Sequence, residues 1–214
     1  MNIIFDLDGT LIDSATDICA ILNSLLRDRD KAALSLDTTR RFIGEGAAVL
    51  IERVMKAREI DAGDGAHARL LAQFIERYET MPTLSPFYDG VARTLTVLRN
   101  DGHRLGLCTN KPEGPTRAVL AQTGLANSLD AVIAGGMIDS RKPEPDMLLK
   151  VLTDMGGQPA LFVGDSETDA ETARSAGIPF ALFSGGYRKG PVSAIHHDWL
   201  FDHFDELATI VARL

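Results

Sequence analysis

Short apolar runs alternate with segments of helical length over the second half of the sequence. The runs are 105–108, 131–134, 160–163, 180–183 and, more weakly, 199–201. The segments around them predict helices at 90–100, 116–122, 145–155, 168–176 and from Asp205 onward. Such alternation favours right-handed βαβ crossovers with all strands parallel. Together with the apolar run 3–5, which predicts a first buried strand, it indicates an α/β fold with a doubly wound, Rossmann-like parallel sheet.

A long segment between the first two predicted strands shows only helical periodicity. Its apolar residues recur at helical spacing, at Ile18, Ile21, Leu22 and Leu25 and again at Val49, Leu50 and Val54. A loop with Pro82 and Pro86 follows. We therefore expect a helical cap of residues 15–82, inserted into an α/β catalytic core that comprises residues 1–14 and 83–214.

Charge and hydropathy limit the possible partners. The 22 Lys+Arg and 30 Asp+Glu give a formal charge of −8, so a nucleic-acid partner is disfavoured. The longest stretch without charge, 175–187, is too short for a bilayer, and the acidic N-terminus does not resemble a signal peptide. Cys19 and Cys108 fit a reducing compartment. We expect a cytoplasmic protein without membrane contact, and the sequence leaves monomer and homodimer open.

Polar residues gather where the predicted strands end. In doubly wound sheets, ligands bind outside the carboxyl ends of the strands. The residues found there are Asp6 and Asp8, Thr109 and Asn110, Lys142, and Asp165 with Asp169. Four loops are therefore expected to converge on one small site.

Asp6 and Asp8 lie two residues apart at a strand end, a spacing that in extended chain aims both side chains the same way. The two carboxylates repel unless a hard divalent cation lies between them, and Asp165 could supply a third oxygen ligand. Mg²⁺ suits such a site because it accepts a few carboxylates and keeps positions for substrate phosphate. The set predicts a magnesium site and a phosphate substrate, the alternative being a simple Asp-Gly turn.

These residue types can carry phosphoryl transfer. One aspartate can attack phosphorus while a second protonates the leaving oxygen and then deprotonates the hydrolytic water. The Thr109 hydroxyl, the Asn110 amide and the Lys142 ammonium can hold the phosphoryl oxygens, although Thr109 and Asn110 could also cap a helix. Asp169 is expected to support the site as a first-turn helix residue, as a residue that orients Lys142 or as a metal ligand. Ser166 is expected to support the site by contacting the ligands around the metal.

The four motifs resemble the haloacid dehalogenase superfamily, whose first motif reads Asp-x-Asp-Gly-Thr and is matched by residues 6–10. The other motifs are matched in order by Thr109, Lys142-Pro143, and Gly164-Asp165 with Asp169. The resemblance implies that Asp6 is the nucleophile and a magnesium ligand, and that Asp8 is the general acid/base whose backbone carbonyl also meets the metal. Because the dehalogenase branch lacks the second aspartate, phosphoryl chemistry is favoured. The helical insertion matches the cap of subfamily I.

Four local stretches are similar to bacterial phosphoglycolate phosphatases: 13–18, 43–53, 109–112 and 185–187. This resemblance implies that 2-phosphoglycolate is the substrate. It also implies that Gly44, Glu45, Gly46 and Arg53 read the substrate when the cap closes. Glu45 departs from the neutral polar residue common at this position, and an acid would oppose a carboxylate substrate. Either Glu45 points outward or the substrate is another phosphate ester.

The sequence thus predicts a magnesium-dependent phosphatase that hydrolyses a small phosphate monoester through an aspartyl-phosphate. The core motifs leave other substrates open, namely a sugar phosphate, a nucleotide or pyrophosphate. They also leave open a phosphomutase, because the cap decides which acceptor is admitted. Outside the enzymes, the alternative is a regulatory protein that binds phosphate without turnover.

Overall fold

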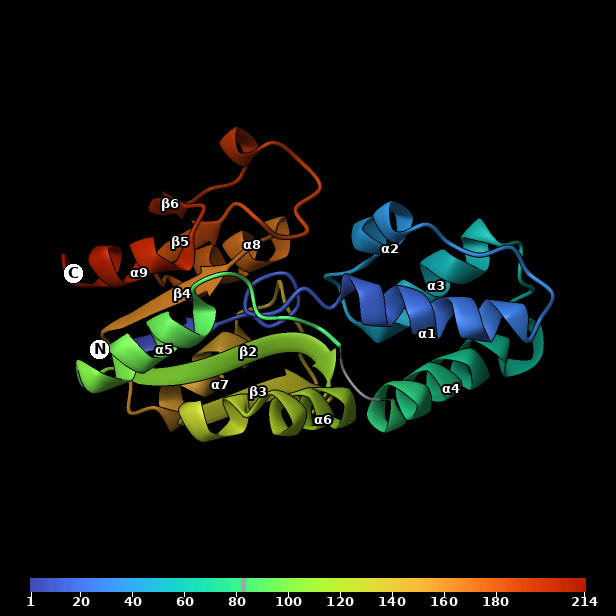
Figure 1. The fold of residues 1–214 in the computed structure, drawn as a ribbon, viewed down its shortest axis with the longest axis horizontal. Coiled ribbons are helices and arrows are strands. Elements are labelled where there is room, and N and C mark those ends of the chain that lie inside the picture. Colours follow the sequence, from blue (N-terminus) through green and yellow to red (C-terminus); the bar gives the residue numbers. More distant parts are fainter. Residues whose placement is uncertain (82–83) are drawn as a thin grey trace.

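The computed structural model describes residues 1–81 and 84–214. Within these residues a six-stranded sheet has the order β3-β2-β1-β4-β5-β6, and every neighbouring pair is parallel (Figure 1). The strands are β1 (Asn2–Phe5), β2 (Arg104–Pro112), β3 (Ala131–Gly135), β4 (Ala160–Gly164), β5 (Phe180–Phe183) and β6 (Trp199–Phe201). The chain runs outward from β1 in both directions, which confirms the doubly wound fold.

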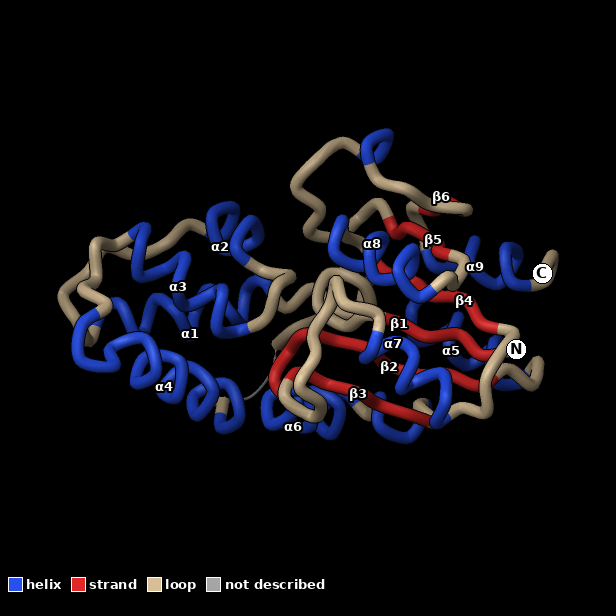
Figure 2. The backbone as a smooth tube through the Cα atoms, turned by 180° about the vertical axis from the view of Figure 1, so that it is seen from behind, coloured by secondary structure: helices blue, strands red, loops and turns tan. Residues whose placement is uncertain are grey.

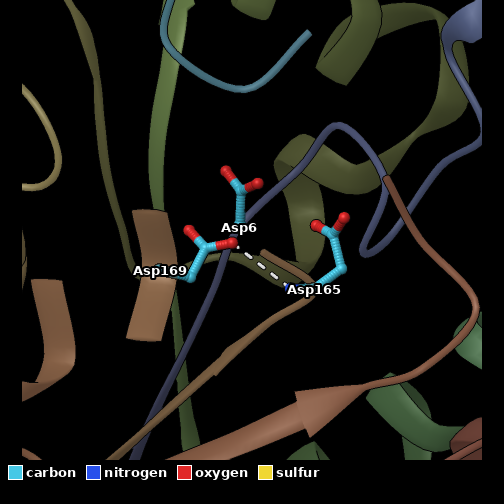
Figure 3. Close-up of side chains that lie close together, drawn as sticks. All are labelled: Asp6, Asp165 and Asp169. Atoms are coloured by element: carbon cyan, nitrogen blue, oxygen red, sulfur yellow. Dashed lines mark hydrogen bonds between the residues drawn. The ribbon is translucent and has the colours of Figure 1, made fainter. Parts of the chain in front are cut away.

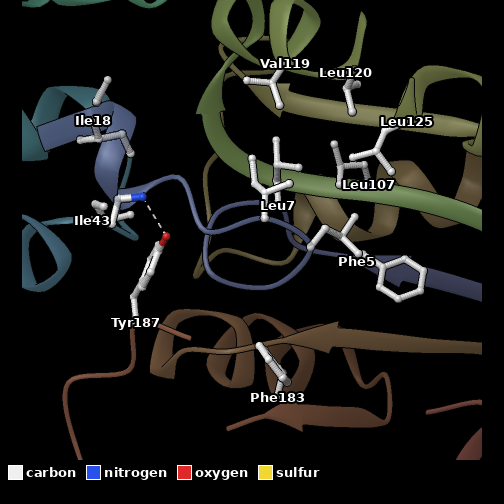
Figure 4. Close-up of a cluster of buried hydrophobic side chains, with 14 of the residues drawn as sticks. Phe5, Leu7, Ile18, Ile43, Leu107, Val119, Leu120, Leu125, Phe183 and Tyr187 are labelled. Carbon is white, nitrogen blue, oxygen red and sulfur yellow. Dashed lines mark hydrogen bonds between the residues drawn. The ribbon is translucent and has the colours of Figure 1, made fainter. Parts of the chain in front are cut away.

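Helices cover both faces of this sheet. They are α5 (Val91–Asn100), α6 (Glu113–Thr123), α7 (Asp146–Asp154), α8 (Glu167–Ala176) and α9 (Phe204–Val211), with short 3₁₀ turns at Leu125–Ser128 and Val192–Ala194. Side chains alternate between the faces of each strand, so two apolar layers form. Phe5 and Leu107 pack in the layer with α5, α6 and α9 (Figure 4), whereas Ile4 and Phe162 pack in the layer with α7 and α8.

The expected helical segment contains α1 (Ala15–Arg27), α2 (Leu36–Phe42), α3 (Ala47–Ala57) and α4 (Ala66–Thr80), with a 3₁₀ turn at Gly63–Gly65. These helices pack on one another and lie beside the sheet, at the carboxyl ends of the strands (Figures 1 and 2). We call residues 15–81 the helical insertion. The expected boundary between residues 82 and 83 lies outside the described residues.

Strand β2 is longer than its apolar run indicates. It continues through Thr109 and Asn110 to Pro112, with a shift of register against β3 between Thr109 and Pro112. Pro112 is the N-cap residue of α6, so the alternative that Thr109 and Asn110 cap a helix is wrong. The backbone stays extended because these polar residues remain within the sheet. The extension carries Lys111 to the edge of the helical insertion.

No helix among the described residues has the length and apolar character needed to cross a bilayer.

Candidate active site

Three buried carboxylates meet where β1 and β4 end. Asp6 follows β1 and Asp165 follows β4, and the two strands pair directly. Asp169 reaches the same point from the first turn of α8. One oxygen of each carboxylate lies within 4.8 Å of the others, and Figure 3 shows the three side chains converging from separate elements. The sequence prediction brought these residues to one site, with Asp169 only in a supporting role.

The Asp169 carboxylate holds the start of α8 in place through hydrogen bonds. Its Oδ2 accepts hydrogen bonds from the backbone N–H groups of Asp165 and Ser166, each at 3.2 Å, and from the Ser166 hydroxyl at 2.6 Å. Ser166 in turn caps α8 by accepting from the Asp169 N–H. This reciprocal capping box fixes both residues at the helix start. A Cβ at Gly164 would lie 2.5 Å from that of Asp169, so only glycine admits this approach.

Lys142 bridges two of the carboxylates. Its Nζ lies 2.8 Å from Asp6 Oδ1 and 2.6 Å from Asp169 Oδ1, and the side chain is 2% exposed. Burial acts to lower the pKa of Lys142, but the charges of Asp169 and Asp6 outweigh burial and raise it. Lys142 therefore stays a cation at the base of the site, as its predicted role requires.

Asn110 holds the loop that presents Lys142. Its side-chain amide donates to the Lys142 carbonyl at 3.0 Å and accepts from the Lys142 N–H at 2.9 Å, and it also donates to the Gly44 carbonyl. The expectation that this amide holds a phosphoryl oxygen therefore differs from the observed contacts. Thr109, which is 1% exposed, lies beside it at the cavity that Asp6 and Asp8 line.

The acidic cluster, formed by Asp6, Asp165 and Asp169, carries more negative charge than Lys142 compensates. Burial raises the pKa of Asp6 to about 7, with further increases from Asp169 and Asp8 that Lys142 partly opposes. Burial, followed by the charges of Asp169 and Asp6, also raises the pKa of Asp165 well above its usual range. Crowded, buried carboxylate oxygens are the donor set that hard divalent cations prefer. The residues therefore fit such a metal, which would relieve their mutual repulsion.

Asp6 and Asp8 line the same two cavities, as their spacing predicted, but the Asp8 carboxylate is not one of the three clustered carboxylates. The Asp8 carboxylate instead lies 3.0 and 3.3 Å from Lys111 Nζ. The chain turns directly after β1, where the Leu7 carbonyl accepts three backbone hydrogen bonds and Gly9 adopts φ +93°. A Cβ at Gly9 would lie 2.6 Å from Asp165 Oδ2, so this turn packs directly on the acidic cluster.

Sequence reasoning gave no role to several residues that shape the site. The Thr10 hydroxyl donates to Asp165 Oδ1 at 2.8 Å, and the Tyr187 N–H donates to Oδ2 at 2.5 Å. The Tyr187 hydroxyl also accepts from the Ala15 N–H at the start of the helical insertion (Figure 4). Thr10 belongs to the first motif and Tyr187 to the stretch 185–187 that resembles phosphoglycolate phosphatases. Membership of these motifs was the sequence signal for a role of either residue.

The residues of the helical insertion that were predicted to contact the substrate lie in different places. Gly44 and Gly46 line the cavity beside Asp6, and Glu45 lines an adjoining one. Arg53 lines neither of these described cavities, because it donates to the Phe42 carbonyl and to Glu45 at 2.5 Å.

Glu45 is paired with cations on both sides. Besides Arg53 it contacts Lys189 of the α/β core, whose Nζ lies 2.6 Å from Glu45 Oε1. Burial acts to raise the pKa of Glu45, but hydrogen bonds from Arg53 and Lys189 outweigh it and lower the pKa. The charge that was expected to oppose a carboxylate substrate is therefore compensated.

The fold and the site together define the class of the protein: a doubly wound α/β enzyme with a lysine and an acidic cluster at the carboxyl ends of its strands. Residues 3–183 match the family of haloacid dehalogenase-like hydrolases, and the chain belongs to this family.

Curated relatives match along the whole chain. The chain is 43% identical over 214 residues to a phosphoglycolate phosphatase of Cereibacter sphaeroides, covering 100% of this chain and 98% of that protein. It is 41% identical to a phosphoglycolate phosphatase of Rhodospirillum rubrum, with 96% and 88% covered. A crystal structure of a predicted phosphoglycolate phosphatase from Haemophilus somnus 129pt has a TM-score of 0.91 at 31% identity, with 98% and 96% covered. The similarity therefore includes the helical insertion as well as the sheet.

Proposed function

We propose that this hydrolase is a magnesium-dependent phosphatase of small phosphate monoesters and that 2-phosphoglycolate is its substrate. The observation that carries the proposal is Asp6, a buried carboxylate that contacts Lys142 and lines a cavity with Thr109. The full-length similarity to proteins named phosphoglycolate phosphatase supports the choice of ester. The charge of −8 supports a small-molecule partner rather than a nucleic acid or an anionic membrane surface. We propose a cytoplasmic location, which the two cysteines Cys19 and Cys108, both free among the described residues, support.

In this proposal Asp6 and Asp8 share the chemistry. An Asp6 oxygen attacks phosphorus, the bond from phosphorus to the ester oxygen breaks, and Asp8 gives its proton to that leaving oxygen. Asp8 then takes a proton from water as the water oxygen attacks phosphorus of the aspartyl-phosphate. The bond from phosphorus to the Asp6 oxygen breaks, and inorganic phosphate leaves. Asp6 is then a carboxylate again and Asp8 is again protonated.

Donors around Asp6 hold the phosphoryl oxygens. Lys142 and the Thr109 hydroxyl are positioned at the base of the site, and Asn110 acts through the Lys142 loop. Asp6, Asp165 and the backbone carbonyl of Asp8 would hold Mg²⁺. The ion would supply positive charge to the phosphoryl oxygens. Asp169, backed by Ser166, orients Lys142 and supports the acidic cluster.

We also propose that residues 15–82 act as a cap over an α/β catalytic core of residues 1–14 and 83–214. The helical insertion contributes Ile43, Gly44 and Leu50 to the cavity that Asp6 and Asp8 line. Walls from both parts would exclude water from the reacting groups when the ester is bound.

Phosphate release from a panel of esters tests the activity. We expect 2-phosphoglycolate to give the highest kcat/KM with Mg²⁺, and EDTA to reduce the rate roughly a hundredfold or more. Readdition of Mg²⁺ is the control. A higher kcat/KM for a sugar phosphate or nucleotide would contradict the substrate. Absence of hydrolysis for every ester would favour the binding or mutase alternatives.

The ion pair between Glu45 and Lys189 gives a test of the cap. It joins the helical insertion to the core, and its side chains are 35% and 42% exposed, so its contribution is small. We expect Glu45→Gln and Lys189→Met each to raise KM by about two- to fivefold with kcat little changed. Because both remove the same pair, the double variant should show less than the product of the single effects. Fully multiplicative effects in steady-state kinetics would contradict the coupling.

A further inference from the structure

Lys111 is a buried cation that the proposed mechanism does not use. It lies near the end of β2 with its side chain 2% exposed. Its Nζ contacts Asp8 of the core and the hydroxyl of Tyr78, which comes from α4 of the helical insertion. Nζ also lies 3.8 Å from the centroid of the Tyr78 ring, a cation–π distance. Both parts of the chain therefore hold this ammonium in place.

One N–H donor of the Lys111 ammonium is available to a ligand. A lysine carries three N–H donors, and among the described residues the hydrogen-bond partners of Lys111 Nζ are Asp8 and Tyr78. Burial raises the pKa of Tyr78 well above its usual range, so its hydroxyl stays neutral and compensates no charge. Lys111 also lines the cavity beside Asp6. An acceptor in that cavity can therefore use the third donor.

The cavity beside Lys111 is small and largely apolar. Its volume is about 40 Å³, and since a water needs roughly 10–15 Å³, there is space for about three small atoms or groups. The helical insertion closes it with Ile18, Leu50 and Phe74. Among its described lining residues, Lys111 carries the one positive charge, and the two carboxylates, Asp6 and Asp8, also line the adjoining cavity. A carboxylate, with three heavy atoms, fits this space, and one of its oxygens can accept from the third N–H of Lys111.

The adjoining cavity has the opposite character. It is larger, about 260 Å³, and besides Asp6 and Asp8 three further carboxylates line it, those of Glu45, Asp165 and Glu167. Among its described lining residues Lys189 is the one cation. Since Lys189 is paired with Glu45, the remaining carboxylates leave a negative surface that suits a cation. A substrate carboxylate is therefore favoured on the Lys111 side of Asp6 and opposed on the other.

We propose that Lys111 determines substrate specificity by binding the carboxylate of the phosphate ester. The ammonium keeps Asp8 and Tyr78 as fixed supports and gives its third N–H to the substrate while phosphorus faces Asp6. Tyr78 of the helical insertion contacts Lys111, so the substrate carboxylate is bound where the insertion meets the core. This inference rests on the proposed function and names the group of the substrate that is recognised.

Two esters of equal length test the inference. 2-Hydroxyethyl phosphate carries a neutral hydroxymethyl group where 2-phosphoglycolate carries its carboxylate. We expect the wild type to prefer 2-phosphoglycolate and Lys111→Met to lower the ratio of the two kcat/KM values by about ten- to a hundredfold, because one charge-assisted hydrogen bond is lost. Lys111→Arg should retain part of the preference. Lys150→Met, which changes an exposed lysine that pairs with Asp154 and lines neither described cavity, is the control and should leave the ratio unchanged.

The outcomes separate the two proposals. An unchanged ratio in folded Lys111→Met, or an equal loss for both esters, would show that Lys111 supports Asp8 without reading the substrate, and the inference would fail alone. A wild type that does not prefer 2-phosphoglycolate would overturn both proposals. Thermal melting checks the fold of each variant, and Lys111→Gln replaces Lys111→Met if the latter does not fold.

Discussion

Asp6→Asn is expected to abolish phosphate release, with a loss of roughly 10⁴-fold or more, because an amide cannot attack phosphorus as a carboxylate does. The fold should persist, since asparagine has the same shape and its oxygen can still accept from Lys142 Nζ, which lies 2.8 Å from Asp6 Oδ1. Single-turnover assays and circular dichroism measure the two effects. Retained turnover in a folded variant would overturn the assignment of Asp6 as nucleophile.

The same variant has an expected effect on stability without metal. Burial raises the pKa of Asp6 from 3.8 to about 7, so between these values the folded state binds more protons than the unfolded state. Stability from this group is therefore present at low pH and lost as pH rises toward 7. Asp6→Asn cannot ionise and escapes this loss.

Melting curves in EDTA measure this effect. At pH 8 we expect the Tm of Asp6→Asn to exceed that of the wild type by a few degrees, corresponding to roughly 1–3 kcal/mol. The difference should shrink toward pH 4. A constant difference in Tm from pH 4 to pH 8 would show that Asp6 carries no such charge strain.

Much of the fold follows from local sequence signals. The strands 160–163 and 180–183 are apolar on both faces and are bounded by turn residues, so their type and order could be predicted. The position of Asp165 beside Asp6 then follows from the doubly wound order, because β1 and β4 are neighbours and end at the same edge.

The partner of the Asp8 carboxylate could not be predicted in the same way. The spacing rule gives the common direction of Asp6 and Asp8 toward one cavity, but it does not identify the residue that Asp8 contacts. The partner of Asp8, Lys111, lies 103 residues away in sequence, at the end of a strand that runs further than its apolar residues. Its burial depends on the helical insertion, which no local pattern places.

The helical insertion shows the same limit. Arg53 was expected to read the substrate from its place in a glycine-rich cap stretch, yet it supports Glu45 and the Phe42 carbonyl. Glu45 finds its second cation in Lys189, 144 residues away. Ion pairs of this separation depend on how the two parts of the chain meet, and charge patterns along one helix carry no information about that.

Lys142→Met is expected to give the largest loss of stability among the variants considered. The ammonium is buried and contacts Asp6 and Asp169, so its removal leaves the acidic cluster without its bridging cation. Removing one partner of a buried ion pair costs about 3–5 kcal/mol, because the remaining charge stays desolvated. Urea denaturation in EDTA at pH 8 measures this loss. Hydrolysis should also fall below detection, since the phosphoryl oxygens lose a donor.

A second substitution separates charge imbalance from lost packing. In Lys142→Met/Asp169→Asn the uncompensated carboxylate is gone, and asparagine can still accept from the Ser166 N–H to cap α8. We therefore expect the double variant to recover part of the stability lost in Lys142→Met, but no activity. Such non-additive changes in stability indicate that the two residues interact. Lys150→Met, which breaks an exposed pair with Asp154, is the control and should change stability little. If the losses of Lys142→Met and Asp169→Asn simply add, Lys142 acts through packing, and the acidic cluster does not depend on its charge.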